Sequence, residues 1–222
     1  MNLTLFDLDG TLIPKDSDHA FGEFAITLGW ADPDEFRRRN DAFYADYLEG
    51  TLDIDAYVEF ATAPWRHRAA EELARAQADF LAQIVEPMVS DKARALVREH
   101  QQAGDCVAIV TATNDFVTRP IAALLGVNEL IATVLARDAH GRVLGTVAGV
   151  PSFREGKITR VQDWLAGRGK TLADFERSTF YSDSTNDLPL LERVSHPVAT
   201  NPGPALERIA RERGWPVLNL FA

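Results

Sequence analysis

The stretch that most constrains the fold is an apolar run near the start, Leu3–Ile13, which two aspartates and a glycine interrupt. A short apolar segment that ends at a glycine is typical of a buried strand running into a loop. In an open α/β sheet, ligands bind in the crevice beyond the carboxyl ends of the strands. Asp7 and Asp9 follow the predicted strand, so we expect both carboxylates at that edge of the sheet.

Two carboxylates this close in the sequence repel each other unless a positive charge lies beside them. A hard divalent cation with oxygen ligands meets this need, and Mg²⁺ often takes one or two carboxylates from the protein. An isolated Asp-x-Asp more often marks two solvated turn residues. The interpretation of Asp7 and Asp9 as a metal site therefore depends on complementary residues later in the chain.

Length, charge and cysteine content narrow the class of protein. The 222 residues, 46% of them hydrophobic, suffice for one large domain or for a core with a smaller insertion. A formal net charge of −10 disfavours nucleic acid as a general partner. Cys106 is the single cysteine, which excludes an intramolecular disulfide and suits a reducing compartment. No leader pattern and no apolar window of roughly 18 residues is found, so we expect a cytoplasmic protein without a membrane partner.

Residues 16–86 carry only helical patterns between the first two predicted strands. Phe21, Phe24 and Leu28 keep helical spacing, and glycine and proline residues separate the segments that follow. About 70 residues are too many for one crossover helix. We therefore predict an inserted helical cap at 16–86 and a core made of 1–15 and 87–222.

The rest of the chain alternates between strand and helix patterns. This alternation predicts an α/β core with a doubly wound, Rossmann-like parallel sheet. The predicted strands are 107–110, 179–181, 197–199 and 216–218, with a β-hairpin formed by 131–136 and 143–148. The predicted helices are 92–103, 115–125, 155–166, 187–193 and 204–213.

Four motifs stand at or near the ends of predicted strands, and their order resembles that in the haloacid dehalogenase superfamily of phosphotransferases. The motifs are Phe6–Leu12, Thr111–Thr113, Gly156-Lys157 and Ser182–Asp187. The cap after the first motif and the hairpin before the third make the chain most similar to the phosphoserine-phosphatase-like subfamily, IB. Ser182 departs from the family pattern, where a glycine is usual, and we expect little effect from it.

The resemblance implies a Mg²⁺-dependent phosphomonoester hydrolase that forms an aspartyl-phosphate. Asp7 would attack phosphorus, which replaces one difficult displacement by two easier ones. Asp9 would protonate the leaving oxygen and then activate water. In this family the metal ligands correspond to Asp7, the backbone carbonyl of Asp9, and Asp183. Asn186 and Asp187 would orient the metal site or its waters from an outer shell.

The resemblance also implies a phosphate-binding set. The Thr111 hydroxyl and the backbone amide of Ala112 would bind phosphoryl oxygens, and Lys157 would offset the charges of Asp7 and the phosphate. Taken singly, Thr111 fits a helix cap and Lys157 fits a solvated helix residue. The ordered set of motifs favours the catalytic interpretation.

Substrate choice is expected to lie in the cap, because the core handles only the phosphate. Asp16 stands where phosphoserine phosphatases contact the substrate amine. Those enzymes also hold the substrate carboxylate with a cap arginine, but the likely region here has no arginine until Arg66. We therefore favour an amine-bearing phosphate such as histidinol phosphate over phosphoserine. Three aromatic residues would either pack the ring of such a substrate or, more simply, form the cap core: Phe21, Tyr57 and Trp65.

Three other functions share parts of this pattern. A receiver-type signalling domain also combines acidic residues, Thr and Lys, but its phospho-acceptor lies on a later strand and it lacks a long helical insertion. A non-catalytic phosphate-ester binding module is disfavoured by the intact Asp7 and Asp9 pair. A phosphotransferase to an acceptor other than water stays open. We expect a monomer or homodimer that acts on a small phosphate ester.

Overall fold

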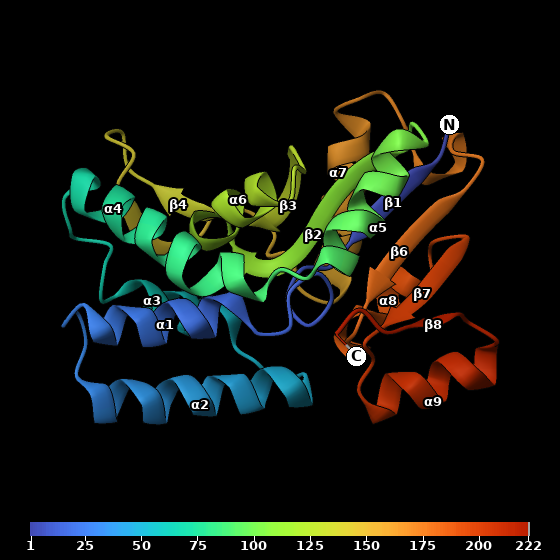
Figure 1. Ribbon diagram of the computed structural model, residues 1–222. Helices are drawn as coiled ribbons and strands as arrows, with labels where there is room; N and C mark the ends of the chain where they lie inside the picture. Colours follow the sequence, from blue (N-terminus) through green and yellow to red (C-terminus); the bar gives the residue numbers. More distant parts are fainter. Residues whose placement is uncertain (222) are drawn as a thin grey trace.

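A six-stranded parallel sheet forms the centre of the computed structural model, which describes residues 1–221 (Figure 1). The strand order is β3-β2-β1-β6-β7-β8, and each neighbouring pair is parallel. The strands are β1 (Leu3–Phe6), β2 (Cys106–Asn114), β3 (Glu129–Thr133), β6 (Ser178–Ser182), β7 (His196–Thr200) and β8 (Val217–Leu218). Because β1 lies between β2 and β6, its carboxyl end opens at the switch point of the sheet, where ligands bind in such folds.

Helices cover both faces of the sheet, as the doubly wound prediction requires. They are α5 (Asp91–Gln102), α6 (Asp115–Leu124), α7 (Glu155–Ala166), α8 (Leu188–Leu191) and α9 (Pro204–Arg213). Side chains of a strand alternate between faces, so Leu3 and Leu5 join the apolar cluster under α7, α8 and α9, whereas Phe6 joins the cluster under α5 and α6. In residues 1–221 no helix combines the length and apolar character needed to cross a bilayer.

The insertion between β1 and β2 is helical, as predicted. It contains α1 (Ser17–Thr27), α2 (Pro33–Glu49), α3 (Ile54–Thr62) and α4 (Ala70–Phe80), then a π-helical turn (Leu81–Val85) and a 3-10 turn (Glu86–Met88). Asp16, Asp32 and Asp53 accept hydrogen bonds from backbone amides as the N-caps of α1, α2 and α3. Figure 1 shows these helices beside the carboxyl end of β1.

The base of the insertion packs directly on the core. The Trp65 ring stacks on Phe116 of α6 with 4.1 Å between centroids, and Phe21 meets the edges of Trp65, Phe80 and Phe116. Phe21 and Trp65 are 2% and 1% exposed. Both therefore belong to the hydrophobic core, which confirms the simpler of the two predictions for them and excludes contact with a substrate ring.

The hairpin prediction was right in place and wrong in extent. β4 (Leu135–Arg137) pairs antiparallel with β5 (Val143–Val147), but residues 131–133 belong to β3 of the main sheet. Thr133 still pairs with Asn114 of β2, and the chain turns into the hairpin only after it. A continuous apolar run does not reveal where a chain changes from one partner strand to another.

Candidate active site

The strand register brings the predicted motifs to one edge of the sheet. Phe6 of β1 pairs with Ile109 of β2 and with Tyr181 of β6. The residues that follow each of these three positions therefore lie at the same level, since the strands are parallel. This places Asp7, Thr111 and Asp183 around the carboxyl end of β1.

A buried ammonium group joins two of the motifs. Lys157, in the first turn of α7, is 1% exposed, and its Nζ lies 2.8 Å from Asp7 Oδ1 and 2.7 Å from Asp187 Oδ1. Burial alone would lower the lysine pKa, but the charges of Asp187 and Asp7 raise it above its usual value. The Ser182 hydroxyl donates to Asp187 Oδ2 at 2.7 Å. The departure from glycine at position 182 thus adds a hydrogen bond to this ion-pair network.

The acidic groups at this edge outnumber the cation. Burial, followed by the charges of Asp7 and Asp187, raises the pKa of Asp183 well above its usual value. When Asp7, Asp183 and Asp187 are ionised, their three negative charges exceed the one positive charge of Lys157 by two, which is the charge of one divalent cation. Carboxylate oxygens are the donors that Mg²⁺ prefers, so Asp7 and Asp183 fit this ion.

The first loop allows Asp183 to approach closely. The Thr11 hydroxyl lies 3.1 Å from Asp183 Oδ1 and 3.4 Å from Asp7 Oδ2. Gly10 has φ +73°, and a Cβ there would stand 2.2 Å from Asp183 Oδ2. Among residues 1–221 no three His, Cys, Asp or Glu side chains are arranged as a metal cage. A cation held by this pair would take its other ligands from backbone, water or phosphate oxygens.

Asp9 is held by several donors. Its Oδ1 accepts from the Ser17 amide at 2.7 Å, and its Oδ2 accepts from the Thr113 hydroxyl at 2.8 Å. Burial is the largest effect on its pKa and the charge of Asp16 adds to it, so that the pKa rises to about 7. A carboxyl group with this pKa can both give and take a proton at neutral pH.

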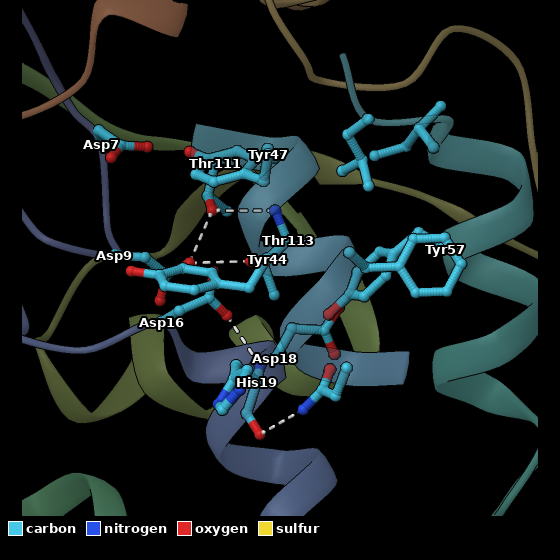
Figure 2. A pocket seen from close by; sticks show the side chains of 15 residues that line it. Asp7, Asp9, Asp16, Asp18, His19, Tyr44, Tyr47, Tyr57, Thr111 and Thr113 are labelled. Atoms are coloured by element: carbon cyan, nitrogen blue, oxygen red, sulfur yellow. Dashed lines mark hydrogen bonds between the residues drawn. The ribbon is translucent and has the colours of Figure 1, made fainter. Parts of the chain in front are cut away.

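The second motif meets Asp9 through two threonines. The Thr111 hydroxyl lies 3.5 Å from Asp9 Oδ2 and accepts from the Thr113 amide at 3.2 Å, as Figure 2 shows. Thr113 makes the shorter contact with Asp9, although only Thr111 was singled out from the sequence. Side chains two apart on a strand share a face, and this rule would have found Thr113. The roles of Thr111 and Ala112 in phosphate binding stay predictions.

A pocket of about 490 Å³, counted with the open space at its mouth, extends from this edge into the cap. Figure 2 shows Asp7 at one end and Tyr57 well away from it. No lysine or arginine is found among its described lining residues. They are Asp7, Asp9, Asp16, Asp18, His19, Asn40, Phe43, Tyr44, Tyr47, Leu52, Ile54, Tyr57, Thr111, Ala112 and Thr113.

The cap contributes two carboxylates to the pocket, Asp16, which was predicted, and Asp18, which was not. Asp16 lines the pocket, and its Oδ1 accepts from the His19 amide at 2.8 Å. Burial raises the pKa of Asp16 to about 6, although that hydrogen bond opposes the shift. Asp18 also lines the pocket and is 7% exposed. Tyr57 lies in the pocket, as one of the two predictions for it required.

Arg66 and Asn186 are not among the residues that line the pocket. Arg66 Nη1 donates to the Glu59 carbonyl at 3.1 Å and lies so close to Gly145 of β5 that a Cβ on this glycine would be 2.2 Å away. The Asn186 amide donates to the Tyr47 carbonyl of α2 at 2.7 Å. This contact with the cap was not predicted from the sequence, and the outer-shell role of Asn186 stays a prediction.

Comparison with known proteins agrees with this geometry. The family described as haloacid dehalogenase-like hydrolase matches residues 4–192. A histidinol-phosphatase of Neisseria meningitidis serogroup C is 48% identical over 218 residues, which cover 98% of each chain. A crystal structure of a protein with unknown function from Bordetella pertussis Tohama I has a TM-score of 0.93 at 48% identity, covering 99% of each chain. A substrate-bound phosphoserine phosphatase shares the fold, with a TM-score of 0.68 at 18% identity over 97% of this chain and 91% of that one. This chain is therefore a phosphatase of the haloacid dehalogenase-like hydrolase family.

Proposed function

We propose that this phosphatase hydrolyses histidinol phosphate in preference to phosphoserine, through a covalent phosphate on Asp7 and with Mg²⁺ as its metal. The observation that carries the proposal is the composition of the pocket beyond Asp7. Its described lining presents the carboxylates of Asp16 and Asp18 together with aromatic rings, and it contains no lysine or arginine. Such a pocket suits a substrate with a positive charge and an aromatic ring.

The catalytic proposal assigns two steps to two carboxylates. Asp7 attacks phosphorus while the bond to the ester oxygen breaks, and Asp9 gives its proton to that oxygen. Asp9 then takes a proton from water, the hydroxyl attacks phosphorus, and the bond to Asp7 breaks to release inorganic phosphate. Burial raises the pKa of Asp7 to about 7, and Lys157 opposes this shift, so that it favours the ionised nucleophile and also offsets the phosphate charge.

The metal proposal names Asp7, Asp183 and the backbone carbonyl of Asp9 as the ligands. When bound, Mg²⁺ supplies positive charge that stabilises the phosphoryl oxygens in the transition state. Asp187 is hydrogen-bonded to Lys157 and Ser182, which supports a role in orienting the site from its outer shell. Thr111 and the Ala112 amide line the pocket beside Asp9, which supports their proposed role in phosphate binding.

The position of Arg66 supports the choice of substrate. Its guanidinium packs on the hairpin, so the described pocket offers no strong cation to a substrate carboxylate. The carboxylate of phosphoserine would enter a space that the carboxylates of Asp16 and Asp18 already line. Negative charges that share one pocket repel each other. The name of the Neisseria relative, histidinol-phosphatase, at 48% identity supports the same choice. We also propose that residues 16–86 act as the cap that selects the substrate.

The test is phosphate release by the purified chain with Mg²⁺ from histidinol phosphate, phosphoserine and 2-aminoethyl phosphate. We expect kcat/KM for histidinol phosphate to exceed that for phosphoserine at least about tenfold, since a single unfavourable charge contact is worth a few kcal/mol. Equal or faster hydrolysis of phosphoserine would contradict the substrate assignment.

Asp7→Asn is the matched control for the covalent step, because it keeps the side-chain shape and removes the nucleophile. We expect no measurable turnover with an unchanged circular dichroism spectrum. Full activity of this variant would rule out a phosphate on Asp7. Analysis of the products in the presence of added alcohols checks that water is the acceptor, since a phosphotransferase would yield new phosphate esters.

A further inference from the structure

Asp18 faces the pocket from the first turn of α1, and the mechanism above does not use it. Its side chain lies near Tyr57, away from Asp7, in Figure 2. Asp16 is the extended N-cap residue of the same helix, with φ −69° and ψ 118°. This extended backbone lets Asp16 and Asp18 line one pocket although residues two apart on a helix face different sides. Asp16 also lines a neighbouring cavity, together with Lys15 and Glu23.

The carboxylate of Asp18 is fixed from two other elements. Asn114 Nδ2 lies 3.0 Å from each Asp18 oxygen. The side-chain oxygen Oδ1 of Asn114 caps the N-terminus of α6, where it accepts hydrogen bonds from the backbone amides of Phe116 and Val117. The Tyr57 hydroxyl of α3 faces this carboxylate and lowers its pKa, which favours the ionised form of Asp18. A carboxylate held in this way loses little conformational freedom when it binds a ligand.

The surroundings of Asp18 suit a cation. Burial raises its pKa to about 7 even though the hydrogen bonds from Asn114 and Tyr57 oppose the shift. A positive charge in the pocket would therefore stabilise its ionised form. Phe43 and Ile54 also line this cavity and provide flat and apolar surface for a ring.

We propose that Asp18 is a specificity-determining residue that accepts a hydrogen bond from the ring nitrogen of the substrate, while Asp16 binds the amine next to the phosphate ester. The two carboxylates thus bind two different nitrogen groups of one substrate. This inference rests on the proposed function, since it assumes a substrate that carries both an amine and a nitrogen-containing ring.

The experiment measures ring preference, which is kcat/KM for histidinol phosphate divided by kcat/KM for 2-aminoethyl phosphate. Both substrates have an amine near the ester, but only the first has the ring. In Asp18→Asn, kcat/KM for histidinol phosphate should fall about 10- to 100-fold, mainly through KM, as expected for a lost charge-assisted hydrogen bond. The value for 2-aminoethyl phosphate should stay within about threefold.

Three further variants complete the comparison. Asp16→Asn should lower kcat/KM for both substrates, because both carry the amine. Asp46→Asn, which removes an exposed cap carboxylate on α2, should change neither. Tyr57→Phe removes the hydroxyl that favours the ionised form of Asp18 and keeps the aromatic ring, so it should lower ring preference about threefold. This variant decides the matter if Asp18→Asn does not fold.

Equal losses of kcat/KM for both substrates in Asp18→Asn would overturn the inference, and so would the absence of ring preference in the unaltered enzyme. If Asp18→Asn does not fold, an unchanged ring preference in Tyr57→Phe would overturn it. Failure of the proposed substrate would look different. In that case the unaltered enzyme would release phosphate from phosphoserine at least as fast as from histidinol phosphate.

Discussion

Lys157 is the residue on which the charge balance of the site depends. Its buried ammonium contacts both Asp7 and Asp187. Lys157→Ala leaves two buried carboxylates without this cation, and breaking such a pair costs about 3–5 kcal/mol. We expect the free energy of unfolding to fall by that order and turnover to be lost. Urea unfolding checks this, with Lys170→Ala as the control, and an unchanged midpoint for Lys157→Ala would contradict it.

Asp9 predicts a pH dependence of catalysis. Its pKa of about 7 means that it loses its proton as the pH rises above neutrality, and the first step of the proposed mechanism needs that proton. We expect kcat/KM for histidinol phosphate to fall about tenfold per pH unit above that pKa. p-Nitrophenyl phosphate has a leaving group that needs little protonation, so its kcat/KM should fall less steeply. Identical alkaline slopes for the two substrates would exclude Asp9 as the acid.

Asp18 predicts a pH dependence of stability. Its pKa is about 7 in the folded protein against 3.8 for the free group, so the folded state binds this proton more tightly than the unfolded state. The resulting stabilisation is complete below pH about 4 and is lost as the pH rises through about 7. Without metal or substrate, the free energy of unfolding should therefore decline between pH 5 and 8 more steeply than in Asp18→Asn. Urea titrations at both pH values measure this, and parallel declines would contradict it.

At the scale of elements, the C-terminal end of α2 is hydrogen-bonded to two segments of the core, the loop before Lys157 and the turn that contains Asn186. Arg154 Nη1 donates to the Gly50 carbonyl at 2.6 Å, and Asn186 donates to the Tyr47 carbonyl. The Tyr47 and Phe153 rings also meet, with 5.8 Å between centroids. Arg154 has φ +51° and ψ −122°, and non-glycine residues rarely adopt a positive φ. The loop before Lys157 is thus held in an uncommon shape where it touches the cap.

Arg154→Ala removes this contact and should let the end of α2 separate from the core more often. We expect KM to rise about three- to tenfold with kcat within about twofold, because the loss of one hydrogen bond to a charged group weakens closure. Hydrogen exchange of the amides near Gly50 should increase in parallel. Arg142→Ala, on the exposed hairpin turn, is the control. Unchanged exchange and KM in Arg154→Ala would show that the contact does not hold the cap.

At the scale of the whole molecule, the chain has a net charge of −10. Three of its carboxylates, those of Asp7, Asp183 and Asp187, lie together at the carboxyl end of β1. Mg²⁺ that binds only the folded state must raise the unfolding temperature. We expect millimolar Mg²⁺ to raise the midpoint of thermal unfolding and Asp183→Asn to abolish that rise, while a chelator abolishes phosphate release. An equal rise in the Asp183→Asn variant would place the ion elsewhere.

The sequence alone determined the central architecture and the motif residues. The strand before Asp7, the helical insertion and the later alternation of strands and helices all follow from local periodicity and turn chemistry, which depend on neighbours in the chain. Parallel strands then bring their carboxyl ends together, so the meeting of Asp7, Thr111 and Asp183 was predictable without coordinates.

Only the tertiary structure decided which cap residues face the pocket. Periodicity shows that a helix has an apolar face, but the partner of that face is set by contacts between distant segments. Phe21 and Trp65 therefore turned out to pack on α6, whereas Asp18 reached the pocket because Asn114, almost a hundred residues later, holds it there. Residues 131–136 are divided between the main sheet and the hairpin for the same reason. The partner of a strand is set by contacts with distant segments, and a short apolar run carries no information about them.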